Sequence, residues 1–156
     1  MQIARQRMAS RIGEPLARKS TDWVADMHET TVVEGLMRIL ATKAREHGID
    51  RIVSVRLKIG RLRGLDVRQI RGCFEIFAEA TVAENAHLEI EEVEIEARCR
   101  TCGQVYTVAR FHFECPACGS GDADLLKGRE LEIESFDGHR ADETAPGNSI
   151  SRVDRA

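Results

Sequence analysis

Two short cysteine motifs constrain the fold of this chain more than any other feature of its sequence. They are Cys99-Arg-Thr-Cys102 and Cys115-Pro-Ala-Cys118, with twelve residues between them. A tetrahedral zinc ion binds four thiolates at about 2.3 Å, and each short motif brings two of them together at little cost in loop-closure entropy. Gly103 and Gly119 follow the motifs, where a residue without a Cβ lets the chain turn toward the sulfur atoms. The spacing predicts a closed structural zinc site that stabilises a small lobe.

Other uses of these cysteines are open to the same sequence. A four-thiolate iron centre has the same ligands and geometry. Redox catalysis by C-x-x-C uses one pair on a thioredoxin-like frame, whereas two pairs together saturate one metal ion. Disulfides are less expected, because five cysteines without an apolar signal segment indicate a reducing compartment. His112 lies inside the lobe and is the residue to test as a substitute ligand, while Cys73 falls in a predicted helix and is interpreted as a core thiol.

The length and charge of the chain limit the class of protein. A chain of 156 residues can form one ordinary domain with a metal-stapled lobe. Hydrophobic residues make up 42% and no apolar run approaches the roughly 20 residues of a membrane helix. The net charge of −3 lacks the basic excess that binds a phosphate backbone. We therefore expect a soluble, cytoplasmic protein that binds neither nucleic acid nor a membrane.

Hydrophobic periodicity predicts two helices. Thr31-Val-Val-Glu34 resembles a capping box, and the apolar residues after it recur at helical spacing until Gly48 supplies a stop. Asp66 can cap the second helix. The apolar stripes are Val33, Leu36, Met37, Leu40 and Ala44 in the first helix, and Val67, Ile70, Phe74 and Phe77 in the second.

Alternation with a period of two predicts three strands, at 51–59, 87–97 and 130–134. In the first, Val53, Val55, Leu57 and Ile59 are expected on one face. The second changes phase at Glu91-Glu92, which suggests a bulge or a strand edge, and its glutamates are expected on a solvent face. The strands flanking the cysteines are expected to pair directly. The fold class is therefore α+β, with two helices on a small three-stranded sheet and an inserted zinc-ribbon-like lobe.

These patterns divide the chain into four parts. Residues 27–97 with 128–136 form the body, and 98–127 form the zinc lobe. The tail at 137–156 contains Pro146, Gly147 and Ser151 and is predicted to be disordered. Residues 1–26 form an N-terminal extension whose first 20 residues hold five basic side chains and one acidic one. A disordered basic arm or a misplaced start codon is favoured there over an organelle transit peptide.

A short segment before the first helix adds a second set of candidate metal ligands. His28 in Met27-His28-Glu29 would by itself indicate only an exposed histidine at a helix start. Together with other marks, however, the stretch from Met27 to about Phe136 resembles the HypA/HybF family of hydrogenase nickel-incorporation proteins. The marks are Met27-His28-Glu29, Ile59-Gly60, Phe74 with Phe77, Thr81-Val82-Ala83-Glu84 and the two cysteine motifs.

The resemblance implies a nickel metallochaperone that delivers Ni(II) to the immature [NiFe] hydrogenase large subunit with a hydrogenase-maturation GTPase, while zinc is structural. Some relatives also serve urease. It implies nickel ligands at His28, Glu29 and the main chain of Met27, with Asp66 as a weaker auxiliary, and is compatible with a weak homodimer. Ni(II) favours nitrogen-rich environments, and an exposed imidazole permits transfer. Family members begin at this methionine, whereas 26 residues precede Met27 here, which raises the question of the amine ligand.

Two other classes of function compete with metal delivery. A zinc-ribbon module that only docks onto other macromolecules would leave His28 without a role. An enzyme is disfavoured, because the sequence offers no nucleophile with a base, no phosphate-binding glycine loop and no open metal site beside a general base. Nickel binding that depends on His28 separates delivery from docking.

Overall fold

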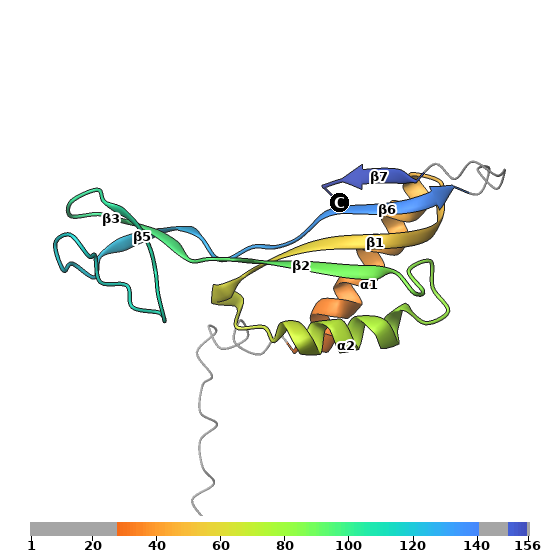
Figure 1. Ribbon diagram of the computed structural model, residues 1–156, viewed down its shortest axis with the longest axis horizontal. Helices are drawn as coiled ribbons and strands as arrows, with labels where there is room; N and C mark the ends of the chain where they lie inside the picture. Colours follow the sequence, from red (N-terminus) through yellow and green to blue (C-terminus); the bar gives the residue numbers. More distant parts are fainter. Residues whose placement is uncertain (1–27, 141–149, 156) are drawn as a thin grey trace, which may run out of the picture.

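The computed structural model describes residues 28–140 and 150–155, which form a body with a narrow lobe projecting from one end (Figure 1). The elements in chain order are α1 (Glu29–Glu46), β1 (Ile49–Gly60), the 3₁₀ turn η2 (Arg61–Arg63), α2 (Val67–Ala78), β2 (His87–Val93), β3 (Glu96–Cys99), β4 (Val105–Thr107), β5 (Ala123–Lys127), β6 (Leu131–Arg140) and β7 (Ser151–Asp154). Neither α1 nor α2, the two α-helices among the described residues, has the length and hydrophobicity needed to cross a membrane.

The body is a four-stranded sheet in the order β2-β1-β6-β7, with both helices on one face (Figure 1). β1 pairs in parallel with β2, because α2 makes the crossover between them, and antiparallel with β6. The core lies between sheet and helices, where Leu40, Ile52, Ile70, Phe74 and Phe136 are at most 1% exposed. The predicted α+β class is confirmed.

The helix ends follow from local sequence, with one correction. α2 begins where predicted, because the Asp66 side chain accepts a hydrogen bond from the Arg68 N–H. Gly48, at φ +66°, ends α1 as predicted. The capping box at Thr31 is wrong, since α1 already starts at Glu29 and the N–H of Thr31 donates to the carbonyl of His28. A carboxylate at Glu29 favours this earlier start, because it faces the positive end of the helix dipole.

The tail beyond residue 136 differs from the prediction where the structure describes it. β6 continues to Arg140, and Ser151–Asp154 form β7, which pairs antiparallel with β6. The disorder predicted for these residues is wrong, and the body sheet has four strands rather than three. Val153 explains the difference, because it lies opposite Phe136 in the sheet and packs into the core at 8% exposure. One apolar residue in a four-residue strand is too little periodicity to read from sequence. The extension at 1–26, with Met27, lies outside the described residues.

The lobe has its own three-stranded sheet in the order β4-β3-β5. The strand predicted at 87–97 ends at Val93 and restarts at Glu96, so the phase change near Glu91 marks a passage between two sheets. The direct pairing predicted for the strands flanking the cysteines is wrong in the body, where β1 separates β2 from β6. It is β3 and β5 that pair. The lobe sheet therefore begins before residue 98.

Body and lobe meet at a close crossing of main chains. The N–H of Gly60 donates to the carbonyl of Glu130 at 2.8 Å, and the N–H of Leu62 donates to the carbonyl of Gly128 at 2.9 Å. The side chain of Leu62 packs against the core of the lobe. A Cβ on Gly60 would overlap the carbonyl group of Gly128, so this position requires glycine.

Candidate metal centres

The four cysteines of the two motifs come together at the free end of the lobe. Cys99 ends β3, Cys102 lies in the turn after it, and Cys115 and Cys118 lie in a second turn before β5. Their sulfur atoms all lie within 4.8 Å of one another. Among the described residues, this is the one group of three or more His, Cys, Asp or Glu side chains placed to share a metal ion. His112 is exposed and is not part of the group.

The two cysteine turns have the same hydrogen-bond pattern. In each, the N–H of the first cysteine donates to a carbonyl five residues later, and its carbonyl accepts from the N–H of the glycine that follows the motif. The four bonds are Cys99 to Gln104 at 2.8 Å, Gly103 to Cys99 at 2.9 Å, Cys115 to Ser120 at 2.8 Å and Gly119 to Cys115 at 2.8 Å. Both glycines have positive φ, +78° and +72°, as the sequence indicated. The Thr101 hydroxyl donates to Ser120 Oγ at 2.9 Å and ties the turns together, a link that sequence reasoning missed.

The spacing of the sulfur atoms fits zinc. Cys99 Sγ lies 3.6 Å from Cys118 Sγ, and Cys102 Sγ lies 3.6 Å from Cys115 Sγ. Four thiolates at about 2.3 Å from a tetrahedral centre would be separated by about 3.8 Å, so little movement is needed to enclose the ion. Cys99 and Cys115 are buried while Cys102 and Cys118 are exposed, so the site lies at the surface of the lobe. This group of cysteines can hold zinc.

The four thiols affect one another's ionisation. The N–H of Cys102 hydrogen-bonds to the Cys99 sulfur and lowers the pKa of that thiol to about 6. The N–H of Ser120 likewise lowers the pKa of Cys118. The hydrogen bond with Cys99, burial, and the hydrogen bonds with the other two sulfur atoms together outweigh this effect and raise the pKa of Cys118 to about 12. Four thiols at this spacing do not all ionise unless a positive charge lies between them.

The lobe has little else to hold it together. Its core consists of two of the cysteines with four other buried residues, Ile95, Ala97, Tyr106 and Val108. The Tyr106 hydroxyl donates to the carbonyl of Phe113 at 2.6 Å. A core of this size does not stabilise a sheet alone, so metal binding contributes directly to folding.

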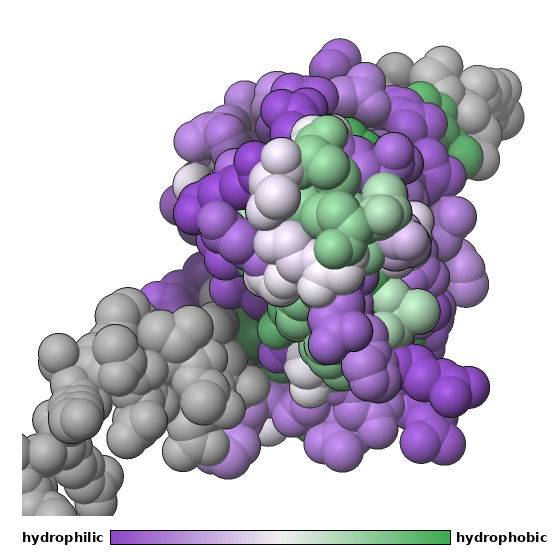
Figure 2. Space-filling view, turned by 90° about the vertical axis from the view of Figure 1, so that its left-hand side faces the viewer, coloured by the Kyte–Doolittle hydropathy of each residue, from purple (hydrophilic) through white to green (hydrophobic). Residues whose placement is uncertain are grey.

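The lobe also carries exposed hydrophobic side chains. Figure 2 views the molecule from the end at which the lobe lies and shows a hydrophobic area bordered by hydrophilic residues. The exposed large hydrophobic residues of the lobe are Val105, Phe111 and Leu126, and Phe111 is 61% exposed. Such surface is typical of an area that contacts another protein.

The candidate nickel residues lie on the body, at the start of α1. His28 is the N-cap residue and is exposed, and Glu29 is the first helical residue and is half-buried. The Oε1 atom of Glu29 accepts a hydrogen bond from the N–H of Asp66 at 3.1 Å. The start of α1 is thereby joined to the start of α2. The structure brings Glu29 to Asp66 but does not gather their side chains with that of His28 into one ligand cluster, and Met27 lies outside the described residues.

Asp66 is ionised under ordinary conditions. The hydrogen bond from the Arg68 N–H lowers the pKa of its carboxyl below the usual value. Its negative charge lies at the N-terminus of α2, where the helix dipole favours it. A carboxylate that stays charged can serve as an auxiliary ligand for a divalent cation.

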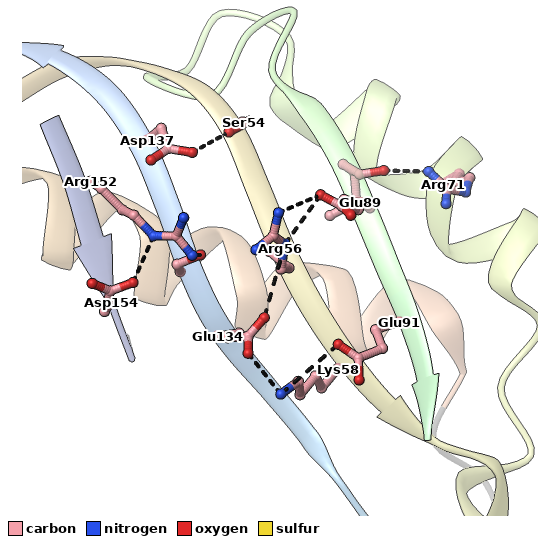
Figure 3. Close-up of polar contacts among 12 residues, drawn as sticks. Ser54, Arg56, Lys58, Arg71, Glu89, Glu91, Glu134, Asp137, Arg152 and Asp154 are labelled. Carbon is pink, nitrogen blue, oxygen red and sulfur yellow. Dashed lines mark hydrogen bonds and ion pairs between the residues drawn. The ribbon is translucent and has the colours of Figure 1, made fainter. Parts of the chain in front are cut away.

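The glutamates of β2 do not form a metal site. As predicted, Glu89 and Glu91 are exposed, and they face cations on β1 across the open side of the sheet (Figure 3). Arg56 Nη2 lies 3.1 Å from Glu89, and Lys58 Nζ lies 2.7 Å from Glu134. The hydrogen bond between Lys58 and Glu134 raises the pKa of Lys58 and lowers that of Glu134. These carboxylates serve as ion-pair partners.

An α+β body joined to a lobe with four gathered thiols defines a small metal-binding protein. A family model described as "Hydrogenase/urease nickel incorporation, metallochaperone, hypA" matches residues 27–138. The chain belongs to this HypA family of nickel-incorporation metallochaperones, which act in hydrogenase maturation. The resemblance inferred from the sequence is confirmed. The family description is that of a maturation factor rather than of a catalyst.

Individual relatives agree with the family match. The chain is 39% identical over 110 residues to the hydrogenase maturation factor HypA of Chlorobaculum tepidum, covering 70% of this chain and 97% of the relative. It is 38% identical over 112 residues to that of Moorella thermoacetica, covering 72% and 99%. The solution structure of the Ni metallochaperone HypA from Helicobacter pylori has a TM-score of 0.55 at 27% identity, covering 73% and 99%.

Proposed function

We propose that this protein binds one Ni(II) ion at the start of α1 and delivers it to the immature [NiFe] hydrogenase large subunit, together with a hydrogenase-maturation GTPase. The observation that carries the proposal is the contact of Glu29 with Asp66 next to His28, in a chain of a nickel-incorporation family. The four cysteines hold one structural zinc ion, separate from the transferred nickel.

The position of His28 suits uptake and release. The residue is exposed at the N-cap of α1, and its carbonyl accepts hydrogen bonds from the N–H groups of Thr31 and Val32, which fixes its main chain to the helix. An imidazole and two carboxylates suit Ni(II), as does main-chain nitrogen from Met27. A site at the surface exchanges its ligands with those of an acceptor more readily than a closed site, so the ion can be passed on.

The two metals have different roles because one site is fully coordinated by the protein and the other leaves coordination positions open. Four thiolates leave zinc without an open position, so it stabilises the lobe. The ligands at the start of α1 come from one helix end and one neighbouring turn, so the nickel site has room for ligands from an acceptor protein. The exposed hydrophobic residues of the lobe support a role in docking onto that acceptor.

The test compares His28→Ala with His47→Ala, since His47 is exposed at the opposite end of the same helix. Zinc-loaded proteins are titrated with Ni(II) by calorimetry, and transfer of radioactive nickel to the purified large subunit is followed with and without the GTPase. We expect His28→Ala to lose nickel uptake and transfer with unchanged zinc content, and His47→Ala to behave as wild type. Wild-type nickel affinity in His28→Ala would contradict the proposed site.

The exposed hydrophobic residues of the lobe also favour a second candidate, an interaction module that docks but carries no nickel. Phe111, at 61% exposure, is the observation that supports it. In that case Phe111→Ser would weaken binding to the large subunit, while His28→Ala would leave hydrogenase maturation in cells unchanged. Loss of maturation in His28→Ala cells, with recovery in excess nickel, excludes this alternative.

A further inference from the structure

Among the residues that the structure describes, β7 is the element that covers the outer edge of β6. β6 pairs with β1 along one side. On the other side, within the described part of the chain, Ser135–Gly138 pair with Ser151–Asp154, and the carbonyl of Glu134 accepts a hydrogen bond from the N–H of Arg155. Val153 packs opposite Phe136, and Arg152 donates to Ser135 Oγ at 3.2 Å. Figure 3 shows Arg152 on β7 reaching across the open face of the sheet. A single strand of four residues thus protects the edge.

This strand lies outside the part of the chain shared with the family. The family match ends at residue 138, before β7 begins at Ser151. The Chlorobaculum tepidum and Moorella thermoacetica relatives are nevertheless covered over 97% and 99% of their own lengths. β7 is therefore an addition to a sheet whose shared part ends with β6.

Without β7 the edge would be well suited to accept another strand. Its main-chain N–H and C=O groups would lose their partners, which makes a sheet edge a template for pairing. Phe136, at 0% exposure, and Ser135, at 2%, would lose their cover. Ser135 is the buried polar residue of the described core, so its hydroxyl would seek a replacement for Arg152.

We infer that the outer edge of β6 is a pairing surface for β6 of a second copy of this chain, and that β7 occupies it in competition with that copy. An antiparallel pair centred on Phe136 places the two Phe136 rings opposite each other on the core face. It places Ser135 opposite Asp137 of the second copy, and Glu134 opposite Gly138. No like charges face each other in this register.

The chemistry of this register already occurs within one copy. Ser54 Oγ donates to Asp137 Oδ2 at 2.8 Å between β1 and β6 (Figure 3). Ser135 would make the same type of bond to the second carboxylate oxygen of Asp137. Opposed aromatic and hydroxyl–carboxylate pairs of this kind stabilise antiparallel sheets. The second copy therefore replaces the contacts that Val153 and Arg152 provide.

β7 competes with the second copy at an advantage, because it belongs to the same chain as β6. β7 is connected to β6 by a short segment, which gives it an effective concentration on the order of millimolar. A second copy at micromolar concentration is outcompeted as long as β7 pairs well. The chain is then monomeric with β7 closed and dimeric when β7 is displaced. This inference is independent of nickel delivery, because the pairing edge involves neither the cysteines nor the start of α1.

The test weakens β7 in the full chain and uses a neighbouring position as control. Val153→Asp places a charge at the buried position, whereas Ile150→Asp makes the same chemical change at a residue that is 52% exposed and outside β7. Sedimentation equilibrium of the zinc-loaded proteins should show a dimer in Val153→Asp, with a dissociation constant at least about tenfold lower than in wild type. Ile150→Asp should match wild type.

A second variant and a peptide keep the result decisive if Val153→Asp folds poorly. A chain ending at Arg140 should also dimerise. A peptide of residues 150–156 should return this dimer to monomers, and the same peptide with Val153→Asp should not. The inference is overturned if the shortened chain stays monomeric, if the peptide leaves the dimer intact, or if open-ended aggregates form in place of a dimer.

Discussion

The Glu29 carboxylate accepts a hydrogen bond from the main-chain N–H of Asp66, with 3.1 Å between Oε1 and nitrogen. This bond joins the start of α1 to the start of α2, and it brings the Glu29 carboxylate to the main chain of Asp66. The Oε1 atom of Glu29 takes part in this bond, and Oε2 can bind a metal ion without breaking it. The second helix thereby positions a candidate ligand on the first.

Asp66 makes the start of α2 sensitive to acid. Because the Arg68 N–H lowers the pKa of Asp66 in the folded protein, its contribution to stability is complete above the unfolded pKa of about 3.9 and is lost as pH falls through the lower folded pKa. Asp66→Ala should lower the unfolding midpoint of metal-free protein at neutral pH. Asp66→Asn, which keeps a cap acceptor, should cost less and flatten the decline below about pH 4. Thermal melts across this range check both, and an unchanged acid limb in Asp66→Asn would argue against the assignment.

Loss of one cysteine ligand should unfold the lobe and spare the body. Cys102→Ser removes a thiolate from the group of four, and three remaining ligands with a small core do not hold the lobe sheet. Metal analysis should show one zinc per wild-type chain and less than one in the variant, with body amide signals retained in NMR spectra. Cys73→Ser is the control, because Cys73 lies on α2 against the body core and should leave zinc content unchanged. Nitrogen or oxygen in the zinc shell by X-ray absorption would exclude the four-sulfur site.

Gly60 and Gly35 should respond in opposite directions to a methyl group. Gly60→Ala drives a Cβ into the carbonyl group of Gly128 and should destabilise the protein by about 1–3 kcal/mol, as overpacking does. Gly35 lies in α1 with nothing within 4 Å of the position of its Cβ, so Gly35→Ala should stabilise by about 0.5–1 kcal/mol. Denaturant unfolding measures both. Equal stability of the two variants would contradict this expectation, because it would mean that the main chains at Gly60 and Gly128 can move apart without cost.

A chain that begins at Met27 should bind nickel more tightly than the 156-residue chain. A terminal amine titrates near pH 8 and can lose its proton to a metal at neutral pH, whereas the amide formed with Asp26 is far harder to deprotonate. The amine would close a chelate with the amide and imidazole of His28. Calorimetry and absorption spectra of the two chains check this expectation, with an oxygen-rich, six-coordinate spectrum predicted for the longer one. Equal affinities with identical spectra would show that the amine is not a ligand.

Short-range features were predictable from the sequence. The two cysteine turns, the Asp66 cap and the stop at Gly48 each depend on a few neighbouring residues, and the structure has all of them. Glu29 was also identified from the sequence as a candidate ligand. Its hydrogen bond with Asp66 was not, because it joins two distant segments that no sequence periodicity connects.

Features that depend on distant partners were not predictable. Val53 was expected in the core, but an irregularity in the pairing of β1 with β6 between Ile52 and Ser54 buries Ile52 and leaves Val53 half-buried. The bulge arises from how the two strands twist together, which neither strand encodes alone. β7 was not predicted for a similar reason, because Val153 is recognisable as a core residue only once it is paired with Phe136.

The central place of β1 links the metal in the lobe to the rate at which the body folds. β6 can join β1 only after the chain from Val93 to Leu131 has left the body and returned. For a flexible chain, each doubling of such a loop adds about 0.6 kcal/mol of entropic cost to closure. Zinc bound by both turns would draw Cys99 and Cys118 together and shorten the free loop, so zinc-loaded chains should refold faster than stripped ones. The ion would then speed the pairing of β1 with β6, although it contacts neither strand.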